Sequence, residues 1–185
     1  VVFTGNTVSG VNYGMVHDAP ADITFTGNNL TAATQAISIQ RQYSSAGVIQ
    51  PTGGLNNINA TGGNTINGVT TGSATLPQLY AIEDAINHKV DSCIFGLVTV
   101  IPNQLYVTTN SSSIQCGIDA ASTGWIVNIK GGTYQGNVDA VAGGDDLAFA
   151  PGSSPGCVVI GGDLTLNGGD DLTIEINGTT PCTGH

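Results

Sequence analysis

The chain has 185 residues, of which 40% are hydrophobic and only 9% are charged. The hydrophobic share supports the core of about one domain, whereas soluble domains usually carry roughly 25% charged residues. Three basic against 13 acidic residues give a net charge of −10, which excludes a nucleic-acid binder, because such a protein needs a basic surface. Glycine (27), threonine (22) and asparagine (16) are abundant, which excludes coiled coils and helical bundles.

The first 43 residues contain an internal repeat. The tetrapeptide Phe-Thr-Gly-Asn occurs at residues 3–6 and again at 25–28, an offset of 22 residues. The same offset aligns Val2 with Thr24, Val8 with Leu30 and Met15-Val16 with Ile37-Ser38. Short apolar segments alternate with Gly/Asn turns, where both residue types tolerate positive φ. This pattern is typical of a solenoid of parallel strands, so we predict β-helical coils over residues 1–43.

The middle of the chain changes character twice. Residues 44–74 are rich in Gly, Asn, Ser and Thr and are expected to form irregular coils or a linker. Beyond them the apolar residues recur at helical spacing, with Thr75 as N-cap and Gln78 as its capping-box partner. We therefore predict one helix over residues 75–91 and a second, shorter helix over Ser112–Ala121.

The other apolar segments alternate with small or polar residues, as strands with one buried face do. The expected strands are Val1–Thr4, Val8–Val11, Tyr13–Val16, Ile23–Thr26, Ala36–Ile39, Leu97–Ile101, Leu105–Thr108, Trp125–Lys130, Val138–Ala140, Asp146–Ala150, Cys157–Ile160, Asp163–Leu166 and Asp171–Ile176. Residues 75–185 are accordingly expected to form a helix-capped β-helical unit, with a hinge at Pro102-Asn103.

Residues 113–134, which end in Lys-Gly-Gly-Thr-Tyr, resemble the opening of pectate-lyase-like right-handed β-helices, where a short helix caps the solenoid and a first strand ends in Gly-Thr-Tyr. Four further segments resemble parts of long, repetitive, secreted bacterial surface proteins of the adhesin or autotransporter-passenger type: residues 82–86, 96–98, 106–108 and 161–184. The resemblance implies a mainly β chain folded as a right-handed parallel β-helix with one or two short capping helices. It also implies an extracellular, structural or adhesive role.

The four cysteines, Cys93, Cys116, Cys157 and Cys182, contain no Cys-x-x-Cys pair. This spacing argues against a zinc site and favours disulfides in an oxidising, extracellular location. Equivalent positions on adjacent parallel strands lie about 4.8 Å apart, a separation that a disulfide can bridge. Because Cys93–Cys116 and Cys157–Cys182 are each separated by about one coil, we predict these two disulfides. Four unpaired thiols in a reducing cytosol are the alternative.

Carboxylates at strand entries are the candidate ligands for a metal ion. Asp145, Asp146, Asp163 and Asp171 would lie on one edge of successive coils. Hard oxygen ligands suit Ca²⁺, so calcium is the one ion we expect here, bound weakly if at all. The alternative role of an aspartate at a turn is to cap backbone N–H groups.

No arrangement in the sequence favours an enzyme. The three basic residues are Arg41, Lys89 and Lys130. Lys89 lies on the first predicted helix, and Arg41 and Lys130 lie in different parts of the chain without the acidic cluster that the base of a polysaccharide lyase needs beside it. The histidines are isolated, and Glu83-Asp84 is expected to be solvated on the polar face of the first helix. We therefore expect no catalytic residues and no cofactor apart from calcium.

The expected function is that of an extracellular structural or adhesive protein, a building block of a surface fibre, filament or passenger. No apolar run of 18 or more residues is present, so membrane insertion is not expected. The alternative is a carbohydrate-binding or polysaccharide-degrading β-helix, and surface glycans are candidate partners. Trp125 is expected in core or cap packing rather than as a platform for a sugar.

Both ends of the chain carry apolar strand patterns without a capping segment. The residues concerned are Val1, Val2 and Phe3 at one end and Leu172, Ile174 and Ile176 at the other. The end of a solenoid exposes unpaired backbone groups, which add strands from neighbours unless they are covered. We therefore expect end-to-end self-association, a heterologous contact that propagates into a filament unless it closes a ring. The alternative is a longer passenger whose other coils cover these edges.

Overall fold

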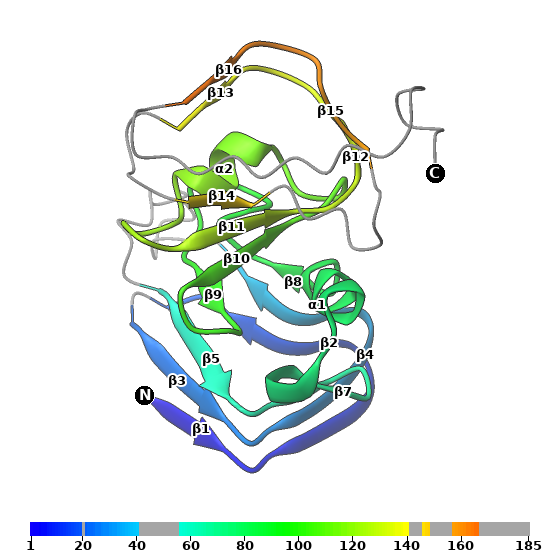
Figure 1. Cartoon of the computed structure of the whole chain (residues 1–185). Coiled ribbons are helices and arrows are strands. Elements are labelled where there is room, and N and C mark those ends of the chain that lie inside the picture. The colour runs from blue at the N-terminus through cyan, green and yellow to red at the C-terminus, as the bar shows by residue number, and fades with distance from the viewer. Residues whose placement is uncertain (20, 41–55, 141–145, 149–156, 167–185) are drawn as a thin grey trace.

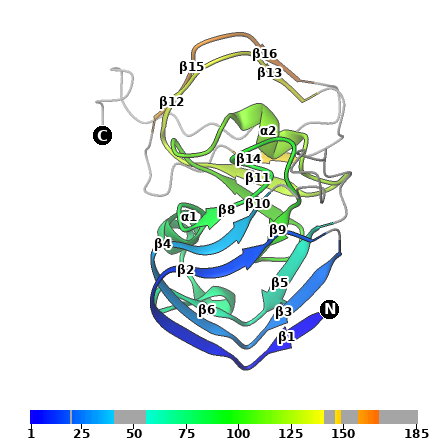
Figure 2. The ribbon, with the colours of Figure 1, turned by 180° about the vertical axis from the view of Figure 1, so that it is seen from behind.

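The computed structural model describes residues 1–19, 21–40, 56–140, 146–148 and 157–166, with the backbone alone for 146–148. In these residues the chain is mainly β, its sheets are mostly parallel, and it contains two short α-helices. Figures 1 and 2 show from opposite sides that the strands are stacked from the N-terminal segment upward.

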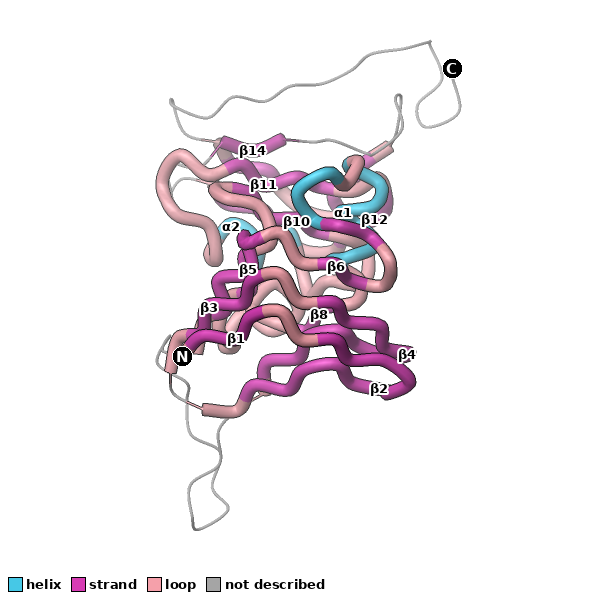
Figure 3. Tube along the Cα trace, turned by 90° about the horizontal axis from the view of Figure 1, so that it is seen from below, coloured by secondary structure: helices cyan, strands magenta, loops and turns pink. Residues whose placement is uncertain are grey.

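Two sheets build the N-terminal part of the chain. The first is a parallel sheet of β1 (Val2–Thr4), β3 (Ile23–Thr26), β5 (Ile58–Gly62) and β9 (Val98–Thr99). The second consists of β2 (Thr7–His17), β4 (Asn29–Ile39), β6 (Thr65–Ile66), β7 (Val69–Thr70) and β8 (Ile86–Asn87). Figure 3 shows β1, β3 and β5 following one another in successive layers. We call β1 with β2 the first layer, β3 with β4 the second, and β5 with β6 and β8 the third.

The register between the first two layers confirms the predicted repeat. The paired residues include Val2 with Thr24, Val8 with Leu30, Met15 with Ile37 and Val16 with Ser38, each 22 residues apart. The two strands expected between Val8 and Val16 are instead one continuous strand, β2, and its register shifts on either side of Val11. The backbones of β2 and β4 approach closely at Gly14, where an added Cβ would lie 2.6 Å from the carbonyl oxygen of Ala36.

The third layer corrects the prediction for residues 44–74. In the described part of this segment, β5 pairs in parallel with β3, so that Ile23 faces Ile58, and β6 pairs with β4, so that Asn29 faces Thr65. The described residues of this segment, 56–74, are therefore part of the stacked sheets and not a linker. The repeat is hidden because the offset between the second and third layers is 35 to 36 residues instead of 22.

The first predicted helix exists but is shorter than expected. It is α1 (Leu76–Glu83), with the short 3₁₀ segment η1 (Thr71–Ser73) before it. The backbone N–H of Thr75 donates to Oε1 of Gln78 at 2.8 Å, which confirms the predicted capping partner. The helix does not reach residue 91, because Ala85 accepts a hydrogen bond from the N–H of Ala36 at 2.7 Å and β8 then pairs with β4. Parallel pairing thus overrides the helical spacing of the apolar residues.

Short parallel pairings build the C-terminal part. They join β10 (Gln104–Val107) to β11 (Ile126–Ile129), β11 to β14 (Asp146–Ala148), β12 (Gly132–Tyr134) to β15 (Val158–Ile160), and β13 (Val138–Asp139) to β16 (Leu164–Thr165). The strands expected in the described residues between 97 and 166 are confirmed to within two residues, and β12 occurs in addition. The strand expected at Asp171–Ile176 lies outside the described residues.

The predicted second helix and the predicted hinge are also present. The helix, α2 (Ile114–Ile118), is shorter than Ser112–Ala121, and Ser113 is its N-cap, with Oγ accepting from the N–H of Cys116 at 3.0 Å. At the hinge, Asn103 has a φ of +58°, and Ile101 and Gln104 form an antiparallel bridge. The chain reverses there between β9 and β10.

Two clusters of buried side chains form the core of the described chain. The larger is built from both N-terminal sheets and α1, and it includes Ile37, Ile58 and Tyr80, whereas Val127 belongs to the smaller C-terminal cluster. Tyr106 of β10 extends the larger cluster, and its ring meets that of Tyr80 edge to face, with centroids 6.0 Å apart. Among the helices described, none has the length and apolar character needed to cross a membrane.

Candidate functional site

Three asparagines form a ladder at the turns that connect the two N-terminal sheets. Asn6, Asn28 and Asn64 each follow a glycine whose φ lies between +63° and +72°. Oδ1 of Asn28 accepts from N and Nδ2 of Asn6, both at 2.9 Å, and Oδ1 of Asn64 accepts from N of Asn28 at 2.9 Å and from Nδ2 at 3.2 Å. Nδ2 of Asn28 also donates to the carbonyl oxygens of Phe3 and Thr26 at 3.1 Å. The ladder therefore links three successive layers.

The outer edge of the first layer is apolar and exposed. Within the described chain, β1 and β2 pair on one side only, with β3 and β4, and β1 lies at the lower edge of the molecule in Figure 1. The exposed fractions are 72% for Val1, 67% for Val2, 41% for Phe3 and 48% for both Tyr13 and Val16. A long strand edge of this kind is a template for pairing with another chain. The residues expected at the opposite end, Leu172, Ile174 and Ile176, lie outside the described residues.

A buried hydrogen-bonded pair lies where α1 leads into β8. Nε2 of His88 is 2.7 Å from Oε1 of Glu83, and both side chains are almost fully buried. Nδ1 of His88 accepts from the backbone N–H of Val98 at 3.0 Å, so Nε2 carries the proton and donates it to Glu83. Asp91 accepts from the backbone N–H of His88 at 2.9 Å, and burial raises the pKa of the Asp91 carboxyl to about 6.

The same three side chains lie close enough together to be considered as ligands of one metal ion. Ligand atoms of Glu83, His88 and Asp91 lie within 4.8 Å of one another. Both ring nitrogens of His88 are already hydrogen-bonded, however, so a metal ion would have to displace either the Glu83 carboxylate or the Val98 N–H. The cluster is better explained as a structural connection between α1, β8 and β9. The expectation that Glu83 is solvated and His88 isolated is wrong, because the helix ends at Glu83 and β8 brings the histidine back over it.

Asp84 connects the N-terminal and C-terminal parts. Oγ1 of Thr108, just after β10, donates to Oδ1 of Asp84 at 2.5 Å. Nζ of Lys130, just after β11, lies 3.5 Å from Oδ2 of Asp84 and 5.9 Å from the centroid of the Tyr80 ring. Thr108 and Lys130 directly follow two paired strands of the C-terminal sheet, so their contacts with Asp84 hold the end of α1 against that sheet.

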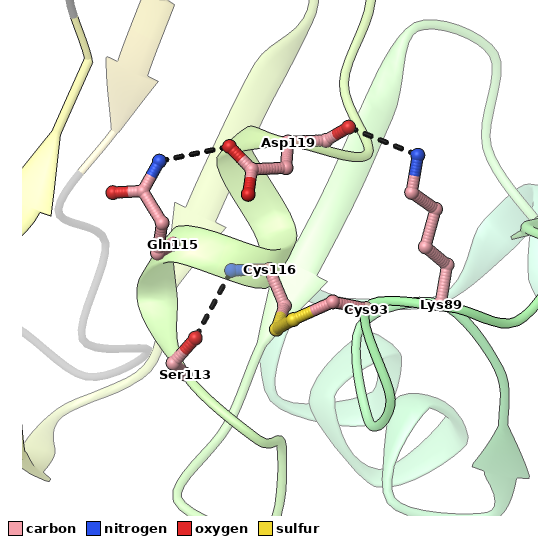
Figure 4. The surroundings of a disulfide bond; sticks show 6 residues. All are labelled: Lys89, Cys93, Ser113, Gln115, Cys116 and Asp119. Atoms are coloured by element: carbon pink, nitrogen blue, oxygen red, sulfur yellow. Dashed lines mark hydrogen bonds between the residues drawn. A yellow bond between two sulfur atoms is a disulfide. The ribbon is translucent and has the colours of Figure 1, made fainter.

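The predicted disulfide Cys93–Cys116 is present, with a Cα–Cα distance of 5.0 Å. The two cysteines do not lie on stacked strands, as we expected: Cys93 lies in a turn after β8 and Cys116 lies in α2. Figure 4 shows that Lys89 reaches the same helix, where its Nζ donates to the carbonyl oxygen of Asp119 at 3.0 Å. The predicted Cys157–Cys182 disulfide cannot be placed in the fold, because Cys182 lies outside the described residues.

The four aspartates predicted as calcium ligands are only partly described. Asp163 is exposed, and its backbone N–H donates to Oδ1 of Asn137 at 3.0 Å. Asp146 begins β14, whose backbone alone is described. Asp145 and Asp171 lie outside the described residues, so the calcium site stays a prediction.

A groove of about 580 Å³ opens where the first sheet meets the turn that carries Trp125. Asn59 of β5 and Thr99 of β9 are register partners and lie along it, as do Phe95, Asn103 and Trp125. Trp125 is partly buried and lines this groove. We expected this residue in core or cap packing and did not predict the groove. The sequence carried no signal for the groove, since its lining comes from segments that only the hinge before β10 brings together.

No protein-family model, curated protein or solved structure matches this chain. The ladder, the exposed strand edge and the groove are therefore the observations from which a function can be inferred. Of these, the exposed edge is predicted by the strand pattern of Val1, Val2 and Phe3. The asparagine ladder and the groove are additions from the structure.

Proposed function

We propose that this chain is an extracellular structural or adhesive protein, folded as a right-handed parallel β-helix, whose copies associate end to end into a fibre or filament. Parallel layers in a 22-residue register and the ladder of hydrogen-bonded asparagines support the β-helix. The disulfide Cys93–Cys116 supports an oxidising location. The proposal includes no catalytic step.

The exposed edge of the first layer is the observation that carries the proposal. Its apolar side chains gain by leaving water, and the free N–H and C=O groups of β1 and β2 offer a parallel partner the pairing that the second layer already uses. The ladder supports the same direction of growth. Oδ1 of Asn28 and of Asn64 each accepts from the preceding layer, whereas Oδ1 of Asn6 accepts from no described residue.

The partner proposed for this edge is residues 171–176 of a second copy, a segment that the sequence pattern predicts to be a strand. Such a contact joins two different surfaces and therefore repeats from copy to copy. The alternative is a longer passenger, in which further coils of the same chain cover the edge. If the purified chain does not associate, this alternative is favoured.

Light scattering over a concentration series, followed by negative-stain microscopy, tests the proposal. The wild-type chain should increase in mass with concentration and form fibres. The double variant Val2→Lys/Val16→Lys should stay monomeric, because lysines on an exposed strand edge oppose strand addition. Ile94→Lys is the matched control, since Ile94 is 44% exposed in a turn away from the edge, and it should assemble as the wild type does.

Two results would overturn end-to-end assembly through this edge. One is a wild-type chain that remains monomeric at every concentration without fibres. The other is a double variant that assembles as well as Ile94→Lys does. In the second case copies associate through another surface, and the exposed edge of β1 and β2 has no part in it.

A further inference from the structure

We propose that the groove beside Trp125 binds a neutral oligosaccharide. The inference rests on the adhesive role proposed above, for which it names the class of ligand and the place where that ligand binds. The groove is separate from the edge of β1 and β2, because its described lining begins at Asn57 and includes no residue of the first layer. Binding and assembly can therefore be measured and disrupted independently.

The groove is formed by structure that is fixed on several sides. Its base includes Asn59 and Thr99, which face each other across neighbouring parallel strands. The tight turn at Asn103 supports one side, and the carbonyl oxygen of Asn103 accepts from the N–H of Ile126 at 3.0 Å, next to Trp125. A ligand would find these groups already in place, which lowers the entropic cost of binding.

The turn that carries Phe95 lies on the groove as well. Phe95 stands two residues after Cys93, so the Cys93–Cys116 disulfide ties this turn to α2. Lys89 also contributes to the lining and reaches the carbonyl oxygen of Asp119, which follows α2. The same turn and helix are shown in Figure 4. These two connections restrain the part of the lining that Phe95 and Lys89 form.

The side chains in the groove combine an aromatic surface with uncharged polar groups. Sugars present apolar C–H faces and a rim of hydroxyls, and a partly exposed indole can cover such a face while its N–H binds a hydroxyl. Neither Nε1 of Trp125 nor Nδ2 of Asn59 donates to any described residue, and the amide of Asn103 is likewise without a partner in the described chain. Oδ1 of Asn59 accepts from N and Oγ1 of Thr61, at 3.2 and 2.8 Å, which leaves its amide nitrogen as the available donor.

The charge of the groove favours a neutral ligand. Its described lining contains no carboxylate, and its one cation, Lys89, is engaged by the carbonyl oxygen of Asp119 at 3.0 Å. Uronates, phosphates and sulfated sugars need free cationic donors to replace their hydration, and the net charge of −10 adds a general repulsion. A small pocket with apolar walls and a few uncharged donors is also the usual composition of a site that orients an uncharged ligand.

Trp125 is the only tryptophan of the chain, so its fluorescence reports directly on the groove. The full chain is first screened on an array of neutral and acidic oligosaccharides. The best neutral oligosaccharide is then titrated into the protein, while the emission of Trp125 and its quenching by acrylamide are followed. We expect the emission to shift and the quenching to fall as the sugar covers the indole.

Variants separate the groove from other aromatic surfaces. Trp125→Ala should weaken binding of the same sugar, measured by calorimetry, about tenfold or more, because a central aromatic anchor is removed. Trp125→Phe should recover part of this loss. Asn59→Ala should weaken binding by a smaller factor. Tyr13→Ala is the matched control, since it removes an exposed aromatic residue from the edge of β2, and it should bind the sugar as the wild type does.

The outcomes are decisive in both directions. Binding of acidic oligosaccharides alone, no binding on the array, or an affinity that Trp125→Ala leaves unchanged would overturn the proposal. Failure of this site is distinguishable from failure of assembly, because Trp125→Ala should form the same fibres as the wild type. Conversely, Val2→Lys/Val16→Lys should bind the sugar with wild-type affinity even as a monomer.

Discussion

Replacing Asn28 by alanine should destabilise the stacked layers more than replacing the adjacent Asn29 or the exposed Asn6 does. The Asn28 side chain is 1% exposed and contacts the layers on both sides. Its Nδ2 donates to the carbonyl oxygens of Phe3 and Thr26, and alanine leaves these oxygens without that donor. Alanine also removes the acceptor of the Asn6 N–H, whereas the carbonyl oxygen of Thr26 keeps the N–H of Gly5 as a donor. Because each net hydrogen bond contributes about 1 kcal/mol, we expect a loss of about 3 kcal/mol.

The assay is thermal and urea unfolding followed by circular dichroism, with Asn29→Ala as the matched control. Asn29 is the next residue, of the same type, and its side chain is exposed at the start of β4. For a chain of this length, 3 kcal/mol corresponds to a fall in Tm of roughly 6–12 °C, whereas Asn29→Ala should change the free energy of unfolding by less than about 0.5 kcal/mol.

Two further variants locate the effect within the ladder. Asn28→Asp keeps an acceptor oxygen toward Asn6 but removes the Nδ2 donor, so it should be at least as destabilising as Asn28→Ala. Asn6→Ala should cost about 1 kcal/mol or less, because Asn6 lies on the exposed edge. Equal stabilities for Asn28→Ala and Asn29→Ala would refute the view that the ladder holds the layers together.

Three further predictions concern the joint between the two parts of the chain. Replacing Cys93 and Cys116 by serine should lower the free energy of unfolding by about 3 kcal/mol, because the disulfide closes a loop of about 24 residues; equal urea midpoints with and without a reductant in the wild type would contradict this. Glu83→Ala should cost about 3 kcal/mol, since it leaves the Nε2–H of His88 buried without an acceptor, while Glu83→Gln, which keeps one, should cost less than half as much. Burial raises the pKa of Asp91 from 3.8 to about 6, so the folded chain holds a proton there that the unfolded chain releases, and its contribution to stability is complete below about pH 4 and lost as the pH rises through 6. In Asp91→Asn the free energy of unfolding should no longer fall between about pH 4 and 6; the fall removed is at most about 3 kcal/mol, and less once solvent screening is allowed for. A variant whose free energy of unfolding falls with pH as steeply as the wild type's would show that Asp91 is not the group responsible.

The first two layers could be predicted because one signal repeats in them without interruption. The matching Phe-Thr-Gly-Asn segments place Gly5 and Gly27 in turns with positive φ and put Asn6 under Asn28. The third layer uses the same device at Gly63-Asn64, but these residues follow Gly27-Asn28 by 36 positions instead of 22. Extra residues between β6 and β8 raise the offset to 49 where β8 pairs with β4. A search for a constant period therefore cannot find it.

The limits at the candidate sites have a similar physical cause. The spacing of Cys93 and Cys116 predicts their disulfide, although the two residues reach each other from a turn and a helix. The helix predicted from the apolar spacing is too long at its C-terminal end. Ile86 can be buried equally well in a helix or in a strand, and only its pairing with β4 decides between the two. The groove at Trp125 depends on the chain reversal at Asn103, which no local pattern relates to β5.

Hydrogen–deuterium exchange at low and high protein concentration tests the central claim, that copies join through the edge of the first layer. Amides of β11 (Ile126–Ile129) are the internal control, because this strand pairs with β10 on one side and β14 on the other. The account predicts that amides within β1 and β2 become protected as concentration rises, while those of β11 exchange at the same rate throughout. Exchange of Val2–Thr4 and Thr7–His17 that does not change with concentration would contradict it.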